Sequence, residues 1–125
     1  MKKVLIVDDS VFSQKMIAIL LQKHIKALDI HFASDGEEGL RVYKEINPDW
    51  VFLDLLMPKL SGQALIPLIH AHDKAANIIV VSADVQNTVK EEVEASGIRM
   101  FLNKPFTEEK VQEVVSLIKE SVHEG

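Results

Sequence analysis

The sequence alternates short apolar, β-branched runs with longer segments whose apolar residues recur every three or four positions. The short runs have the length and composition of buried strands, and the longer ones have the period of amphipathic helices. Near-continuous apolar strands that alternate with helices indicate a parallel sheet covered on both faces. We therefore expect an α/β fold, a doubly wound (βα)5 three-layer sandwich, with strands at residues 3–7, 30–33, 50–53, 78–81 and 100–102.

Helix boundaries are predicted from capping residues. The first helix is expected from residue 10 to about residue 25, and S/T-x-x-E motifs at 34–37 and 88–91 predict capping boxes for two later helices. Pro67 lies inside the third helical segment and has no N–H to donate, so that helix should start late or bend. Gly97 suits a left-handed helix terminus.

Composition excludes several classes of function. The 125 residues fit one domain, and the net charge of −5 argues against binding to a nucleic-acid backbone. The absence of cysteine removes thiolate catalysis and Cys-ligated metal sites. No apolar run is long enough for a membrane span or a secretory signal, so we expect a cytoplasmic protein. No basic residues interleave with the aromatic ones, so these are expected in or near the core: Phe12, Tyr43, Trp50 and Phe52.

Polar side chains stand where the predicted strands end. Asp8 and Asp9 follow the first strand, Asp54 follows the third, Ser82 follows the fourth, and Lys104 lies just after the fifth. Ligands bind at the carboxyl ends of the strands in open parallel sheets. We call these five residues the strand-end cluster and expect them to share one rim of the sheet.

The strand-end cluster suits phosphoryl chemistry at a hard metal ion. Crowded carboxylates need a compensating cation, and oxygen ligands at a shallow rim favour Mg²⁺. A carboxylate can accept a phosphoryl group, with Asp54 as nucleophile, Lys104 as counter-charge and Ser82 as hydroxyl donor. Each residue alone has a simpler explanation, such as Asp8 capping the first helix, but the joint placement favours chemistry.

Four segments together resemble the receiver domain of two-component response regulators, most closely the single-domain CheY-like type. The resemblance covers essentially the whole chain. The segments occur in the family's order and spacing: VLIVDDS at 4–10, FLDLLMPKLSG at 52–62, VVSAD at 80–84 and FLNKPF at 101–106.

The resemblance implies a phosphorylation site and a magnesium site. Asp54 would accept a phosphoryl group from a phosphohistidine on a sensor histidine kinase or histidine phosphotransfer protein, and Ser82 and Lys104 would contact that group. The family's domain catalyses its own Mg²⁺-dependent phosphorylation and dephosphorylation but is chiefly a signalling switch rather than an enzyme. The implied Mg²⁺ ligands are Asp8, Asp9, Asp54 and the backbone carbonyl of Leu56.

The resemblance also implies a sheet of order 2-1-3-4-5, flavodoxin-like and CheY-like. Movement of Ser82 toward the phosphate would be coupled to Phe101, which stands where tyrosine is frequent and cannot make a hydroxyl hydrogen bond. The position of Leu56, two residues after Asp54, is often occupied by a polar residue in relatives. Asp84 likewise lies two residues after a predicted site residue, Ser82. The implied surface for a downstream protein comprises the fourth helix, fifth strand and fifth helix, and an auxiliary phosphatase is a further implied partner.

Two other hypotheses stay open at this point. One is a degenerate receiver that serves purely as an interaction module, which the complete strand-end cluster argues against. The other is a flavodoxin-like cofactor binder, which the acidic rim disfavours because a flavin phosphate is an anion. We expect residues 1–125 to form one receiver domain without an output domain, so that any signal passes to another molecule.

Overall fold

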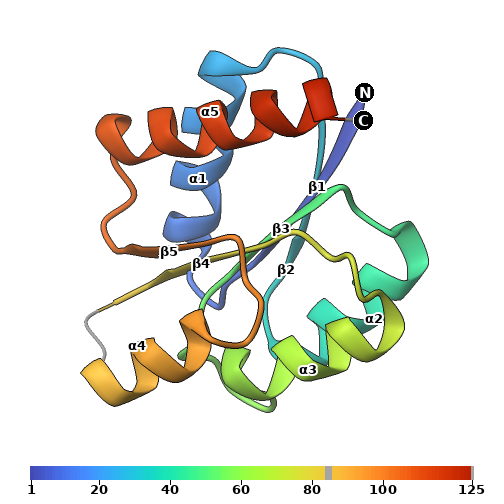
Figure 1. Cartoon of the computed structure of the whole chain (residues 1–125), viewed down its shortest axis with the longest axis vertical. Helices are drawn as coiled ribbons and strands as arrows, with labels where there is room; N and C mark the ends of the chain where they lie inside the picture. The colour runs from blue at the N-terminus through green and yellow to red at the C-terminus, as the bar shows by residue number, and fades with distance from the viewer. Residues whose placement is uncertain (84–85, 125) are drawn as a thin grey trace.

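The computed structural model describes residues 1–83 and 86–124, with side chains up to residue 120, so Asp84 lies outside the described residues. None of the helices in these ranges has the length and apolar character needed to span a bilayer. The elements alternate as predicted (Figure 1): β1 (Lys2–Val7), α1 (Val11–His24), β2 (Leu28–Ala33), α2 (Gly36–Ile46), β3 (Trp50–Leu53), α3 (Gly62–His72), β4 (Ile78–Ser82), α4 (Asn87–Glu94), β5 (Met100–Asn103) and α5 (Glu108–Glu124).

The five strands form one parallel sheet of order β2-β1-β3-β4-β5, which confirms the expected topology. Helices α1 and α5 cover one face, and α2, α3 and α4 cover the other (Figure 1). Alternate residues of β1 enter the two layers, with Val4 and Ile6 facing α1 and α5 while Leu5 and Val7 face the opposite layer. Both faces of the strand are therefore buried, which explains its unbroken apolar run.

Both predicted capping boxes need correction. The N-cap of α2 is Asp35, whose Oδ1 accepts from the N–H of Glu38 at 2.8 Å, while the Glu38 carboxylate accepts from the N–H of Ser34 at 2.7 Å. The box is thus displaced by one residue. At α4 the prediction is wrong, because the helix begins one residue before Thr88 and its N-cap Gln86 makes no side-chain capping bond.

Of the two alternatives predicted for α3, the late start is wrong and the bend stays a prediction. The helix begins at Gly62, five residues before Pro67, because the Ser61 hydroxyl accepts from the N–H of Ala64 at 3.2 Å and caps it there. Pro67 therefore lies inside the helix without preventing its start at Gly62. Gly97 has a φ of 92°, which confirms its predicted left-handed conformation, but α4 already ends at Glu94, so Gly97 is not the helix terminus that was predicted.

The aromatic predictions hold at three positions and fail at one. Tyr43, Trp50 and Phe52 are fully buried, as expected. Phe12 is 73% exposed. The buried positions of α1 are 14, 17, 18 and 21, and residue 12 lies nearly opposite residue 14 around the helix. The apolar character of Phe12 therefore does not reflect core packing.

Candidate functional site

Three residues of the strand-end cluster still pair with the sheet through their backbone. Asp8, Asp54 and Lys104 each lie at or just past a strand end, and each N–H donates to the last carbonyl of a neighbouring strand. The N···O distances are 3.0 Å from Asp8 to β2, 3.0 Å from Asp54 to β1, and 2.7 Å from Lys104 to β4. Parallel pairing thus sets the spacing of these residues, and their side chains are left free to meet above the rim.

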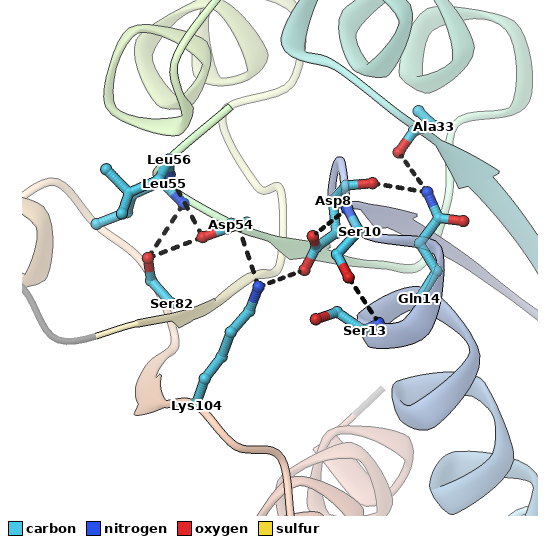
Figure 2. A network of polar contacts seen from close by, with 10 residues as sticks. All are labelled: Asp8, Ser10, Ser13, Gln14, Ala33, Asp54, Leu55, Leu56, Ser82 and Lys104. Carbon is cyan, nitrogen blue, oxygen red and sulfur yellow. Dashed lines mark hydrogen bonds and ion pairs between the residues drawn. The ribbon is translucent and has the colours of Figure 1, made fainter. Parts of the chain in front are cut away.

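The predicted side chains do meet (Figure 2). The ammonium of Lys104 lies 2.9 Å from Oδ2 of Asp8 and 3.2 Å from Oδ2 of Asp54, so it bridges the two carboxylates. The hydroxyl of Ser82 donates to Oδ1 of Asp54 at 2.8 Å. The sequence alone predicted Lys104 as a counter-charge at Asp54, and the structure adds its ion pair with Asp8.

Burial shifts the pKa values of charged groups in this cluster. Asp8 is 1% exposed and Asp54 is 4% exposed, whereas Asp9 is exposed. Burial raises the pKa of Asp8 above its ordinary value, against the opposing hydrogen bond and charge of Lys104. Burial alone would lower the pKa of Lys104, but the hydrogen bond to Asp8 and the charges of both carboxylates outweigh it and raise that pKa. Lys104 therefore stays an ammonium at neutral pH.

The donor set fits a divalent cation. Carboxylate oxygens of Asp8, Asp9 and Asp54 lie within 4.8 Å of one another. The buried Oδ2 of Asp8 lies 2.9 Å from the Lys104 ammonium and, among the described residues, has no donor other than that ammonium. Three carboxylates face one ammonium, and oxygen-only ligands favour Mg²⁺. The backbone carbonyl of Leu56 stays a prediction as a further ligand.

The loop after Asp54 contains backbone donors. The N–H of Leu56 donates to Oδ1 of Asp54 at 3.3 Å, and the N–H of Leu55 lies 3.4 Å from the Ser82 hydroxyl. The loop closes tightly on Gly62, because a Cβ at that position would lie 2.2 Å from the Asp54 carbonyl oxygen. Glycine is therefore needed where α3 begins against the site. The side chain of Leu56 is exposed.

The helix cap predicted as an alternative role for Asp8 belongs to another residue. Ser10 is the N-cap of α1, and its hydroxyl accepts from the N–H of Ser13 at 3.2 Å. Asp8 acts one step earlier, since its Oδ1 accepts from the N–H of Ser10 at 2.9 Å. One oxygen of Asp8 thus supports the cap while the other faces Lys104.

One residue of the site region escaped the sequence analysis. Gln14 is buried, and its amide donates to the backbone carbonyls of Asp8 and Ala33 (Figure 2). A signal was available, because position 14 lies at helical spacing from the buried residues 17, 18 and 21. A polar residue on the buried face of a helix indicates a specific hydrogen-bonding task.

The predicted switch residue Phe101 lies on β5 and is half-buried. The ammonium of Lys90 on α4 lies 5.5 Å from the centre of its ring, within the range of a cation–π contact. The ring thus links α4 to β5, and its coupling to Ser82 stays a prediction.

Comparisons with known proteins agree on one family. Residues 4–116 match the profile of the response regulator receiver domain. The chemotaxis protein CheY of Thermotoga maritima is 35% identical over 117 residues, which cover 94% of this chain and 97% of that protein. A crystal structure of a CheX-CheY-BeF3-Mg²⁺ complex from Borrelia burgdorferi matches with a TM-score of 0.84 and 35% identity, covering 94% of this chain and 89% of that one.

A longer relative matches over part of its length. A protein-glutamate methylesterase/protein-glutamine glutaminase of Geobacter sulfurreducens is 31% identical over 121 residues, which are 97% of this chain. The chain spans 32% of the length of that relative. These matches do not favour the flavodoxin-like cofactor binder. The chain belongs to the response regulator receiver domain family.

Proposed function

We propose that this receiver domain is a Mg²⁺-dependent switch in which Asp54 accepts a phosphoryl group from a sensor histidine kinase or histidine phosphotransfer protein in the cytoplasm. The observation that carries the proposal is the environment of the Asp54 carboxylate. It is buried at the rim of the sheet, with Ser82 and Leu56 as donors to one oxygen and Lys104 beside the other. Such fixed donors stabilise charge that develops during phosphoryl transfer.

In the proposed transfer, a carboxylate oxygen of Asp54 bonds to phosphorus as the phosphorus–nitrogen bond of the donor phosphohistidine breaks. The electron pair of that bond returns to the imidazole, which takes a proton and leaves as neutral histidine. Lys104, 3.2 Å from Asp54 Oδ2, reduces the repulsion between the carboxylate and the incoming anion. Mg²⁺ held by Asp8, Asp9, Asp54 and the Leu56 carbonyl would neutralise charge on the phosphoryl oxygens.

Phosphorylation of Asp54 would then change the contacts of neighbouring side chains. A phosphoryl oxygen competes with the Asp54 carboxylate for the Ser82 hydroxyl, and a shift of Ser82 opens space beside Phe101 on the adjacent strand β5. Because Phe101 contacts Lys90 of α4, we propose that the downstream protein binds at α4, β5 and α5. Phosphorylation would change binding there by favouring one of two arrangements.

The named relatives suggest the pathway. Several proteins called chemotaxis protein CheY match this chain nearly end to end, which supports a role in chemotaxis. The complex of a CheY with CheX supports an auxiliary protein as partner, and we propose a phosphatase that acts on Asp54 phosphate.

The proposal is tested by mass spectrometry after incubation with Mg²⁺ and acetyl phosphate. We expect one phosphoryl group on the wild-type chain and none on Asp54→Asn, which keeps the shape of the side chain but is not a nucleophile. Asp49→Asn, at the opposite end of β3, is the matched control and should accept the group normally. A mass gain that survives Asp54→Asn would sink the assignment. Autodephosphorylation should appear as loss of that mass after the donor is removed, slower when Mg²⁺ is chelated.

A further inference from the structure

The buried polar side chains of the described residues gather around the proposed metal site. They are Asp8, Gln14, Asp54 and Ser82, and three of these belong to the strand-end cluster. Gln14 is the fourth, and it is 6% exposed. Burying an amide is costly unless its hydrogen bonds are satisfied, so its partners indicate why it is there.

The partners of Gln14 are backbone groups at the ends of two strands (Figure 2). Its Nε2 lies 2.6 Å from the Asp8 carbonyl oxygen and 3.2 Å from the Ala33 carbonyl oxygen. It also lies 3.4 Å from the Ser34 hydroxyl. An amide nitrogen carries two hydrogens, and the two carbonyls are its nearest acceptors. Gln14 therefore ties α1 to the ends of β1 and β2 at once.

The bond to Asp8 fixes more than one atom. The Asp8 carbonyl belongs to the peptide unit that joins Asp8 to Asp9, and a peptide unit is planar. Holding that oxygen restrains the orientation of the whole unit, and the Cα atom that carries the Asp9 side chain lies at the far end of this unit. Asp9 is exposed, and within the described part of the chain its carboxylate has no hydrogen bond or ion pair of its own.

We propose that Gln14 is a positioning residue for Mg²⁺ and that its amide sets the relative orientation of Asp8 and Asp9. The inference rests on the proposed function, in which these aspartates hold the ion. Residues that orient metal ligands typically change metal affinity about 10- to 100-fold when they are lost. Gln14 would act through the backbone of the ligand pair and would not touch the phosphoryl group.

The test uses Gln14→Met on the whole chain. Methionine keeps the length and volume of glutamine but donates no hydrogen bond. Titration with MgCl₂ in a calorimeter should show a dissociation constant at least about tenfold higher than that of the wild type. The Mg²⁺ concentration that gives half-maximal phosphorylation by acetyl phosphate should rise by the same factor. The rate at saturating Mg²⁺ should return to that of the wild type.

Ile17→Val is the matched control. Ile17 lies on the same buried face of α1, so shortening it to valine weakens the packing of this helix. The Ile17 side chain makes no hydrogen bond to the end of β1 or β2. The Mg²⁺ affinity of Ile17→Val should equal that of the wild type, although the melting temperature of this variant should be lower. If Gln14→Met also binds Mg²⁺ like the wild type, or if Ile17→Val loses as much affinity, the positioning role is overturned. If the wild type binds no Mg²⁺, the metal site of the proposed function falls as well, and the two failures are thus distinguished.

Discussion

The hydroxyl of Ser82 donates to Oδ1 of Asp54 across 2.8 Å, although the two residues are 28 positions apart in the chain. Ser82 ends β4 and is fully buried, and Asp54 directly follows the paired strand β3. The proposed phosphoacceptor thus already holds the hydroxyl that would later contact the phosphoryl group.

The bond between Ser82 and Asp54 should appear as a coupling in stability. Ser82→Ala leaves a buried carboxylate oxygen short of a donor, so the free energy of unfolding should fall by about 1–3 kcal/mol. In a double-mutant cycle with Asp54→Ala, the coupling should be about 0.5–3 kcal/mol, measured by urea unfolding. Strictly additive losses would show that the two side chains do not depend on each other.

Asp8 should destabilise the fold when no metal is present. Burial raises its pKa above the ordinary 3.8, so the folded state binds this proton more tightly than the unfolded state. The stability that depends on the proton is present below about pH 3.8 and is lost as pH rises through the raised pKa. Asp8→Asn should therefore melt higher than the wild type at pH 7 in EDTA, with the difference shrinking toward pH 4.

With Mg²⁺ present, the wild type should melt higher than Asp8→Asn. A ligand at 100 times its dissociation constant stabilises the state it binds by about 2.7 kcal/mol. The wild type should gain an increase in Tm with Mg²⁺, and Asp8→Asn should gain less because one ligand is lost. Calorimetric melts with MgCl₂ and with EDTA provide the measurement, and equal gains would remove Asp8 from the metal site.

Gly62→Ala should disturb the site through the backbone. The added Cβ would lie 2.2 Å from the Asp54 carbonyl oxygen, so the loop must shift, at a cost of about 1–3 kcal/mol or more. Phosphorylation by acetyl phosphate should slow as Asp54 moves. Gly97→Ala is the control. Its φ of 92° makes alanine costly, but Gly97 lies at the opposite end of the sheet from Asp54, so this variant should lose stability without slowing phosphorylation. Normal phosphorylation in Gly62→Ala would count against the loop's role.

Phe12 and Phe52 should respond oppositely to truncation. Phe52→Ala empties a buried site and should cost about 3–5 kcal/mol of unfolding free energy. Phe12→Ala should stay within about 0.5 kcal/mol of the wild type, because the ring is exposed. Urea unfolding of both variants measures the contrast, and a large loss at Phe12 would mean that its ring packs in solution.

The strands and the rim were predictable because their signals are local. A run such as residues 4–7 is continuously apolar and then ends in Asp8, so both the strand and its functional end are visible in one short segment. The strand order came from the family resemblance alone. The partner of Lys104 at Asp8 was not predictable, since it depends on how distant strands align.

Caps and exposure were less predictable for a different reason. Two overlapping motifs compete at α2, at 34–37 and 35–38, and Asp35 of the second one is the N-cap. At α4 the S/T-x-x-E pattern is present at residues 88–91, but Thr88 is not the N-cap of the helix. Along α1, the apolar residue Phe12 lies on the exposed side, so apolar character alone misplaces it, whereas the spacing of Gln14 from residues 17, 18 and 21 indicates that Gln14 points inward.

The edges of the sheet have a consequence for local unfolding. Asp8 and Asp54 follow β1 and β3, which pair on both sides, whereas Lys104 follows β5, which pairs with β4 alone. An edge strand opens at a lower free-energy cost than a central one. Opening of β5 would withdraw the ammonium and leave the three carboxylates of the cluster to repel one another. Amide hydrogen exchange in β5 therefore reports how often the site loses its own cation.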